Sequence, residues 1–589
     1  MKYSALSKTY QKIESTTKRL EMTDYLVELF KETNPEIIDK VVYLTQGKLY
    51  PDFIGIELGI AEKLALKAIY EATGIKEEEI EKSWIEEGDL GIVTEQMIAK
   101  KKQTTLFSQP LTVERVYKNF EKIAKAVGSG SQDLKLKLLA ELLHDSTSID
   151  AKYIVRTVCG KLRLGIADMT IIDALAIAFA KKEEREEIVR GYNICSDLGY
   201  VAKELAIGGI ERIKNFKVKL GVPLRAMLAE RLESISEILE KLDGRCAFEY
   251  KYDGLRIQAH IGKQKPLESK KIKLFSRRLE DLTSQFPDIV SALREAFGEN
   301  AVIVEGECVP INIQTNELLP FQEVSHRRGR KYGISDAVDE YPVVFFLFDC
   351  LYDGTDLTNK PFLKRRERLK QLIKQTQTIR ISDILITSNE NEVEKFFNEA
   401  IEYGCEGLIA KSIKEDSFYR AGSRGWQWIK YKREYKSELT DTVDLVIVGA
   451  FAGKGRRKGS YGALLMSAYN KEEDCFETVC KLGTGFDDET LEKIPKLLRA
   501  YLIERSHPRV KSKLKADYWF VPEIVMEILG AEITLSQNHT AGWGKIKENT
   551  GISIRFPRFT NRWRDDKRAE DATTVQELIE IYKQQLKKL

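Results

Sequence analysis

The spacing of apolar residues divides the chain into a helical beginning and a mixed remainder. Up to about residue 220, apolar side chains recur three and four positions apart, the spacing of one face of an α-helix. This spacing is clearest in 23–30, 60–73, 111–127 and 134–143. Strand patterns are scarce there. We therefore expect residues 1–220 to form one all-α domain.

The pattern changes near Gly221-Val222-Pro223, where strands begin to alternate with helices. Residues 221–436 are expected to form a mixed α/β domain with helices at 284–297 and 363–375. In residues 437–589, short strands such as 444–450 and 464–469 are separated by Gly-rich turns, and a polar helix follows at 575–586. Such strands predict a small C-terminal β-barrel, an OB-fold. The predicted fold class is multidomain α+β.

One stretch of the α/β domain combines a strand pattern with candidate chemistry. β-favouring and polar residues alternate on both sides of Asp253-Gly254, which predicts a hairpin. Glu249 and Lys251 are expected to project from one strand face, over a cavity or solvent. A lysine amine becomes a nucleophile once it loses its proton, which partial burial or neighbouring cations favour. Lys251 is thus the candidate covalent catalyst, although most lysines on strands are simply solvated.

Length and composition restrict the alternatives. A chain of 589 residues is too long for one core and should divide into about three or four domains. The net charge is only +3, so attraction to nucleic acid must come from local basic faces. Eight cysteines without a C-x-x-C pair argue against a structural zinc site. No apolar run is long enough for a bilayer or a signal peptide, which predicts a soluble, cytoplasmic protein.

Further charged and aromatic side chains lie at strand ends or on strand faces of the α/β domain. The stretches are 275–278, 302–307, 343–350, 406–411 and 423–432. Together with the lysine stretch, and in this order, they resemble the collinear motifs of the covalent nucleotidyltransferases, which include DNA ligases, RNA ligases and mRNA capping enzymes. A sixth motif would lie in 554–559, with Arg555 and Arg558. The helical beginning and 444–450 are most similar to archaeal and eukaryotic replicative ATP-dependent DNA ligases.

This resemblance implies an enzyme that seals nicks in duplex DNA during replication, repair and recombination. It implies a lysyl-AMP intermediate on Lys251, followed by a 5′-adenylated DNA end. The implied ATP-binding residues are Glu249, Arg256, Arg277, Glu307, Phe348, Arg424, Lys430 and Lys432. Phe348 would stack on adenine, and Glu307 and Glu406 would ligate Mg²⁺ or another divalent cation. Glu305 stands where the family commonly has aspartate, which keeps the charge.

Contacts with DNA and with a partner are predicted outside the α/β domain. Lys161 and Arg163 lie in the Gly-bounded turn 160–165, before a helix that Asp168 or Thr170 can cap, and Arg456 and Arg457 lie in a basic turn. Either turn could hold the phosphate backbone or be a plain connector. Gln103, Leu106 and Phe107 resemble a shortened peptide that docks on a PCNA-like sliding clamp, but such a loop can also fold onto its own core. A monomer is expected.

Competing enzyme classes lack specific features. A P-loop ATPase needs G-x-x-x-x-G-K-[ST], and 449–455 has the wrong glycine spacing. RNA ligases and capping enzymes share the motifs but usually lack the long helical domain. NAD⁺-dependent ligases carry a cysteine-built zinc module that is absent here. A non-catalytic DNA-binding relative is disfavoured because every charged position of the core is present. Use of ADP or GTP besides ATP stays open.

Overall fold

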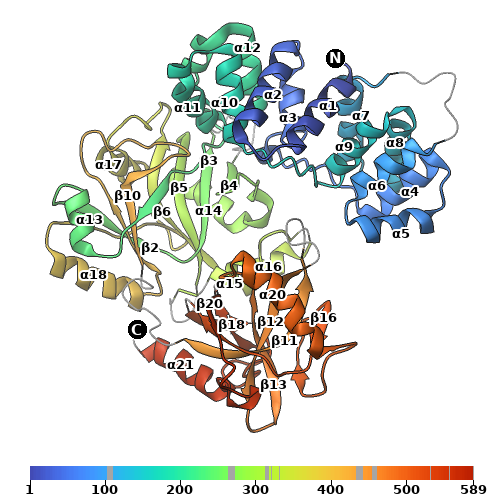
Figure 1. Cartoon of the computed structure of the whole chain (residues 1–589). Coiled ribbons are helices and arrows are strands. Elements are labelled where there is room, and N and C mark those ends of the chain that lie inside the picture. Colours follow the sequence, from blue (N-terminus) through green and yellow to red (C-terminus); the bar gives the residue numbers. More distant parts are fainter. Residues whose placement is uncertain are drawn as a thin grey trace. The chain divides into compact units, whose positions relative to one another are not determined.

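The structure is a computed structural model that describes most of the chain (Figure 1). The described residues are 1–101, 110–262, 272–311, 318–319, 321–330, 332–432, 442–453, 460–530, 532–536, 538–555 and 557–587. They divide into two compact units. The first unit contains Met1–Glu230, Leu239–Ser388 and Ile409–Ile429, and the second contains Arg231–Ile238, Asn389–Leu408 and Lys430–Leu589.

The beginning of the chain is helical, as predicted. Its helices are α1 (Tyr3–Glu14), α2 (Arg19–Glu32), α3 (Ile38–Thr45), α4 (Glu62–Thr73), α5 (Glu77–Glu87), α6 (Leu90–Ala99), α7 (Val113–Lys125), α8 (Ser131–Asp145), α9 (Ser148–Val158), α10 (Asp168–Phe179), α11 (Arg185–Cys195) and α12 (Leu198–Lys214). The four apolar repeats of the sequence correspond to α2, α4, α7 and α8. One apolar core, which includes Tyr3, Phe30 and Phe120, joins these helices.

The α/β part contains two sheets among its described residues. The first has the order β1 (Leu228–Arg231), β10 (Arg424–Lys432), β9 (Gly407–Lys411), β2 (Cys246–Lys251) and β8 (Ile384–Thr387). The second has the order β4 (Ile272–Ser276), β3 (Leu255–Ile261), β5 (Val302–Pro310), β6 (Val343–Tyr352) and β7 (Ile379–Ile381). The helices are α13 (Ile235–Lys241), α14 (Pro287–Phe297), α15 (Phe321–Ser325), α16 (Ile334–Glu340), α17 (Phe362–Leu372) and α18 (Glu390–Glu402). The two predicted helices are α14 and α17.

The predicted hairpin at Asp253-Gly254 is wrong. β2 pairs with β8, whereas β3 pairs with β4 and β5, so the turn carries the chain from one sheet to the other. A Cβ atom at Gly254 would lie 2.5 Å from the carbonyl oxygen of Cys308 on β5, which explains the need for glycine. Asp253 accepts a hydrogen bond from the Phe321 N–H at 3.2 Å. The local signal predicted the turn correctly, but strand pairing depends on distant residues.

Residues 221–227, here called the strap, lie along β3. Side chains at alternate positions of β3 hold the strap, since they share one strand face. The contacts are Gly221 N–H to His260 Nδ1 (3.0 Å), Leu224 N–H to Gln258 Oε1 (2.8 Å), Gln258 Nε2 to the Leu224 carbonyl (3.3 Å) and Arg256 Nη1 to the Met227 carbonyl (2.8 Å). The strap is therefore fixed to the second sheet by side chains rather than as a strand.

The strap also contacts the helical part through Arg225. Its guanidinium donates to Asp168 at 3.0 Å and lies 4.2 Å from the centre of the Tyr192 ring. The backbone N–H of Arg225 donates to the Asn193 carbonyl at 2.8 Å. The expected capping of the helix by Asp168 or Thr170 is wrong, because the residue at the cap position is Ala167. Asp168 instead serves as the counter-ion of the strap.

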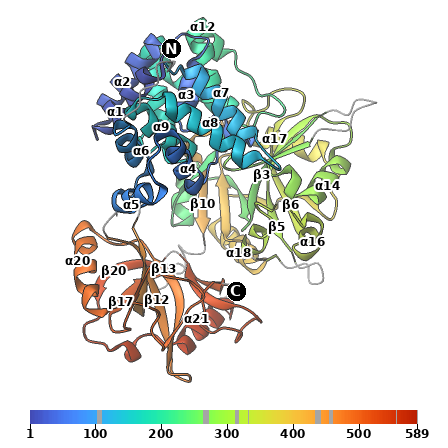
Figure 2. The ribbon, with the colours of Figure 1, turned by 90° about the vertical axis from the view of Figure 1, so that its right-hand side faces the viewer.

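The C-terminal part is rich in β-strands, as predicted. Its main sheet contains β11 (Val443–Ala452), β12 (Tyr461–Asn470), β13 (Cys475–Leu482), β14 (Leu502–Ile503), β15 (Val510–Lys511), β16 (Tyr518–Phe520), β17 (Val525–Leu529) and β20 (Arg558–Trp563). β18 (Glu532–Ser536) pairs with β19 (Gly551–Arg555), and α20 (Asp488–Leu498) and α21 (Val575–Lys587) pack on different sides (Figures 1 and 2). Bulges between β11, β12 and β13 help curve the sheet into a half-barrel, confirming the OB-type prediction.

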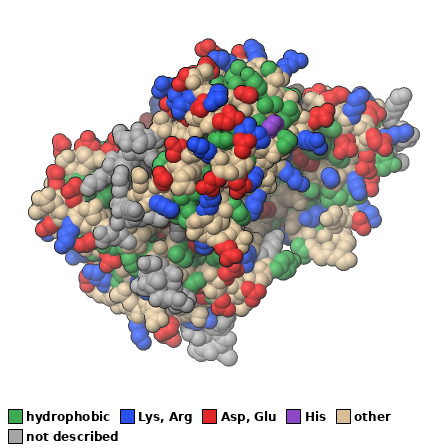
Figure 3. All heavy atoms as spheres, turned by 90° about the horizontal axis from the view of Figure 1, so that it is seen from below, with side chains coloured by type: hydrophobic (Ala, Val, Ile, Leu, Met, Phe, Trp, Pro, Cys, Tyr) green, Lys and Arg blue, Asp and Glu red, His purple; other side chains and the backbone are tan. Residues whose placement is uncertain are grey.

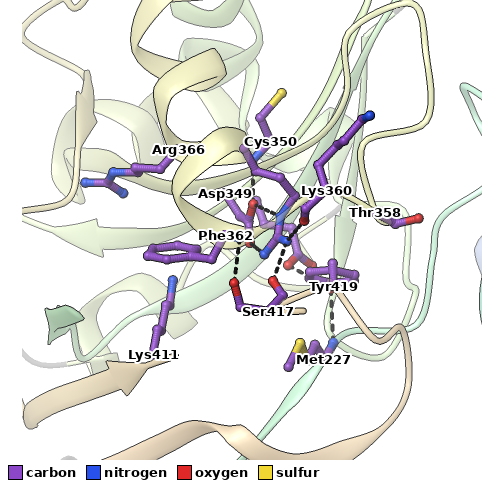
Figure 4. Close-up of polar contacts among 12 residues, drawn as sticks. Met227, Asp349, Cys350, Thr358, Lys360, Phe362, Arg366, Lys411, Ser417 and Tyr419 are labelled. Atoms are coloured by element: carbon purple, nitrogen blue, oxygen red, sulfur yellow. Dashed lines mark hydrogen bonds and ion pairs between the residues drawn. The ribbon is translucent and has the colours of Figure 1, made fainter. Parts of the chain in front are cut away.

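A fully buried ion pair joins β6 to α17 (Figure 4). Asp349 and Arg365 have no exposed side-chain surface, and their two contacts measure 2.8 Å (Nε to Oδ1) and 2.9 Å (Nη2 to Oδ2). Arg365 Nη1 also donates to the carbonyls of Lys360 and Ser417, at 2.6 and 3.0 Å. One guanidinium thus ties β6 and α17 to the segment around Ser417.

We expect Asp349→Ala to lower the free energy of unfolding by about 3–5 kcal/mol, because it leaves the buried Arg365 without its carboxylate. The double variant Asp349→Ala/Arg365→Met removes both charges and should lose less. Urea unfolding of the three proteins tests this. A single variant as stable as the unmodified protein would contradict the prediction.

The stability of the protein should depend on His260 below neutral pH. Burial lowers the pKa of His260 to about 3, whereas its ordinary value is 6.5. Between these values the unfolded chain binds a proton and the folded chain does not, so stability falls as the pH decreases. Lowering the pH from ~7 to ~5 should cost about 2 kcal/mol through this group. His260→Gln keeps an acceptor but does not titrate, and its stability should fall by that much less over the same pH interval.

Candidate active site

Lys251 is half-buried and ends β2, directly before the turn that leads to β3. Glu249, two positions earlier, is only 2% exposed. One of its carboxylate oxygens lies 2.5 Å from Lys411 Nζ, and the other lies 2.9 Å from Arg366 Nη1. Glu249 therefore does not face solvent. Two buried cations hold its carboxylate.

Arg256 is bound to Glu305, the residue that replaces the family's common aspartate. Arg256 Nη2 lies 2.7 Å from Glu305 Oε2, and the hydroxyl of Tyr419 donates to the same oxygen at 2.9 Å. Burial opposes the charge of Arg256, but Glu305 outweighs it, so the pKa of Arg256 lies above its usual range. Glu305 is only 1% exposed. Its carboxylate therefore needs charged and hydrogen-bonding partners to offset the loss of hydration.

The predicted arginines are brought together. Arg256 and Arg277 line one small pocket with Glu305, Gln258 and strap residues. Burial and the positive charges of Arg256 and Arg424 lower the pKa of Arg277, although Glu307 opposes them. Glu307 is half-buried and lies opposite Arg256 in the β3–β5 register. Like charges gathered in one place suit an anionic ligand such as a polyphosphate.

Two aromatic rings lie beside these cations. The rings of Phe348 and Trp428 are 6.1 Å apart at 84°. The guanidinium carbon of Arg256 lies 5.4 Å from the Phe348 centroid and 5.5 Å from the Trp428 centroid. Phe348 is half-buried, so a flat ligand can stack on it at modest cost. The predicted role of Phe348 is compatible with this position.

Several contacting residues were missed from the sequence. Lys411 ends the stretch 406–411 but has no predicted role, and the sequence predicts none for Tyr419, Gln258, His260 and Arg366. Tyr419 is 114 residues from its partner Glu305. For two of these residues the sequence does carry a signal. Gln258 and His260 stand at alternate positions after Arg256, so they share its strand face.

The second unit holds the other predicted side chains. Lys432 and Glu406 form an ion pair at 2.9 Å, and Lys430 lies two positions before Lys432 on β10. Arg558 is exposed at the start of β20. Arg555 ends β19, and its side chain lies outside the described part. Glu307 in the first unit and Glu406 in the second each offer a carboxylate, the hard oxygen donor that Mg²⁺ prefers.

The predicted DNA-contact residues of the helical part are paired with carboxylates. Lys161 forms an ion pair with Glu62, and Arg163 Nη1 lies 3.1 Å from Asp89 Oδ2. Arg163 adopts φ of +56°, an uncommon left-handed conformation. On the face drawn in Figure 3, basic and acidic side chains are intermixed, in agreement with the net charge of +3. Arg456, Arg457, Gln103, Leu106 and Phe107 lie outside the described residues.

Within the described ranges, no helix combines the length and the apolar character needed to cross a membrane.

Comparisons with known proteins identify the family. Models described as "DNA ligase N terminus", "ATP dependent DNA ligase domain" and "ATP dependent DNA ligase C terminal region" match residues 2–176, 226–432 and 457–567. The chain is 52% identical to "DNA ligase 2" of Thermofilum pendens, over 99% of this chain and 98% of that protein. It is 54% identical to a DNA ligase of Sulfophobococcus zilligii, over 99% and 97%.

A solved structure named "Pmar-Lig_PreS3" has a similar fold, with a TM-score of 0.54 and 16% identity over 95% of this chain and 99% of that one. At that identity the likeness concerns the fold alone. The family models and the relatives of about half identity, each spanning nearly the whole chain, show that this chain belongs to the ATP-dependent DNA ligases.

Proposed function

We propose that this protein seals nicks in duplex DNA in three steps. The amine of Lys251 attacks the α-phosphate of ATP, forms a phosphoramidate bond to AMP and releases pyrophosphate. The AMP passes to the 5′-phosphate at the nick, which frees the lysine. The 3′-hydroxyl then attacks that phosphate, forms the phosphodiester bond and releases AMP. The observation that carries this proposal is the gathering of Arg256, Arg277 and Arg424 in the unit that contains Lys251.

Each predicted side chain has a physical role in the first step. Arginine forks bind phosphate or ribose oxygens, and cations draw electron density from the attacked phosphorus and stabilise the departing pyrophosphate. The proposed ATP-binding set is Glu249, Arg256, Arg277, Glu307, Phe348, Arg424, Lys430 and Lys432, assisted by Arg555 and Arg558. Phe348 would stack on adenine, and Glu249 would lie near the nucleoside.

Glu307 and Glu406 would hold a divalent cation such as Mg²⁺. When bound, such an ion neutralises charge on the triphosphate. Glu406 already forms an ion pair with Lys432 at 2.9 Å. A bound metal ion would replace or share this cationic partner.

The proposed organisation assigns DNA binding to residues 1–220, adenylation to 221–436 and an OB-fold to 437–589. A hinge near 433–444 would let the last domain serve ATP in the first step and DNA afterwards. Lys161, Arg163, Arg456 and Arg457 would contact the DNA backbone. Gln103, Leu106 and Phe107 would dock on a sliding clamp. The protein would act as a monomer in the cytoplasm, on the nucleoid, in replication, repair and recombination.

Lys251→Arg should abolish transfer of AMP to the protein, because arginine keeps the charge but does not act as a nucleophile at ordinary pH. The measurement is labelling with α-³²P ATP that survives denaturation, followed by peptide mapping. Lys273→Arg, a substitution on β4 of the second sheet, is the matched control and should label normally. An AMP adduct on a different lysine of the unmodified protein would refute the assignment.

The double variant Lys161→Ala/Arg163→Ala should weaken binding to nicked DNA while leaving self-adenylation unchanged. Two lost phosphate contacts should reduce the salt dependence of log K by roughly 2. Titration of labelled nicked duplex at several salt concentrations measures this, and Lys31→Ala, an exposed lysine of α2, serves as control. An unchanged slope would mean that the turn 160–165 is only a connector.

A further inference from the structure

The guanidinium of Arg256 is fixed through two of its three nitrogens. Nη1 donates to the carbonyl of Met227, the last residue of the strap, at 2.8 Å, and Nη2 donates to Glu305 at 2.7 Å. The third nitrogen, Nε, is buried, and among the described residues it has no hydrogen-bond partner. A buried N–H group without a partner is costly, so a ligand that accepts from it would be favoured. The protein thus holds the outer nitrogens of the fork and leaves Nε available.

One hydroxyl connects the two groups that hold Arg256. The hydroxyl of Tyr419 donates to Glu305 Oε2 at 2.9 Å and accepts from the Met227 N–H at 3.0 Å (Figure 4). It also lies 3.5 Å from Arg256 Nη2. Burial and the negative charge of Glu305 raise the pKa of Tyr419 well above its usual range, so the hydroxyl keeps the proton that it donates. Tyr419 therefore acts on both partners of the guanidinium at once.

The position of this hydroxyl is fixed by the segment that carries it. Tyr419 is 4% exposed, and its ring meets that of Trp428 edge to face, with 6.0 Å between the centroids. The backbone N–H of Tyr419 donates to the Thr358 carbonyl at 2.8 Å, and that of Gly422 donates to the Arg225 carbonyl at 2.9 Å. Ring and backbone are thus both held. A group that orients another side chain needs such support.

We propose that Tyr419 is a positioning residue of the adenylation step. By holding Met227 and Glu305 together, its hydroxyl keeps the fork of Arg256 in one orientation, with Nε left for a phosphate or ribose oxygen of ATP. Tyr419 itself does not contact the nucleotide. This inference rests on the proposed function, in which the ligand is ATP.

Loss of the hydroxyl should slow the chemical step more than it weakens binding. Tyr419→Phe keeps the ring and removes one oxygen atom, so Arg256 stays charged but is less firmly oriented. Misplacement of a group by about 1 Å can reduce a rate ~100-fold, and we expect AMP transfer at saturating ATP to fall roughly 10- to 100-fold. The half-saturating ATP concentration should change little, because Arg277 and Arg424 remain to bind the phosphates.

The experiment is a double-mutant cycle on full-length protein. Single-turnover transfer of AMP from α-³²P ATP to Lys251 is followed over a range of ATP concentrations. The four proteins are the unmodified chain, Tyr419→Phe, Arg256→Lys and the double variant. Lysine keeps a positive charge beside Glu305 but removes the fork. If Tyr419 acts through Arg256, the double variant should be within about twofold of Arg256→Lys, because the second change has nothing left to disturb.

Tyr153→Phe is the matched control. Tyr153 is a buried tyrosine of α9 in the helical part, and its hydroxyl also donates to a carboxylate, that of Glu14, at 2.8 Å. Its loss should lower stability in urea but leave AMP transfer unchanged. All rates are divided by the folded fraction, measured by circular dichroism, so that partial unfolding does not imitate a slower step.

Three results would overturn the inference. A rate for Tyr419→Phe within twofold of the unmodified protein would show that the hydroxyl only satisfies buried polar groups. An equal loss from phenylalanine with and without Arg256 would show that it acts through another residue. A higher half-saturating ATP concentration at an unchanged maximal rate would indicate a lost binding contact rather than a lost orientation. In each case AMP would still reach Lys251, whereas an unmodified protein that forms no lysyl adduct would instead refute the proposed function.

Discussion

The ion pair between Arg256 and Glu305 is the contact on which the rest of the α/β part depends. β3 directs Arg256, Gln258 and His260 to one face, and such polar groups are stable in a buried place only if each finds a partner. Glu305 supplies the charge that Arg256 needs and also accepts from Gln258 and Tyr419. One carboxylate therefore connects β3, β5 and the segment around residue 419. Removing it would leave three donors unsatisfied.

The same face of β3 connects the adenylating core to the helices. Arg256, Gln258 and His260 each form a further hydrogen bond with the strap, and the strap places Arg225 against Asp168 and Tyr192. Asp168 begins α10, only a few residues after the turn that contains Lys161 and Arg163. A displacement of that turn by DNA would therefore act on a segment whose other side is bonded to Arg256. This is a contiguous set of contacts, and any energetic coupling through it would need a second stable arrangement of the strap.

The sequence predicted what depends on local periodicity or turn chemistry. The helices α2, α4, α7 and α8 follow from apolar spacing, and the turn at Asp253-Gly254 follows from its residues. The gathering of Arg256, Arg277 and Arg424 followed from the order of motifs. The partners of β2 and β3, the role of Asp168 and the contacts of Lys411 could not be predicted, because each depends on residues that are distant along the chain. A lysine at the end of a strand has the same local sequence pattern whether it is solvated or, like Lys411, lies beside the rings of Phe348, Phe362 and Trp428.

The arrangement of cations around Phe348 and Trp428 separates affinity from selectivity. A cation near an aromatic ring gains about 0.5–2 kcal/mol. A base that stacks on Phe348 must compete with Arg256 and Lys411 for the same ring, so stacking alone adds little net affinity. Phosphate contacts to the arginines must then supply most of the binding free energy, and they are identical for every nucleoside triphosphate. Discrimination between bases can then arise only from contacts with the base itself.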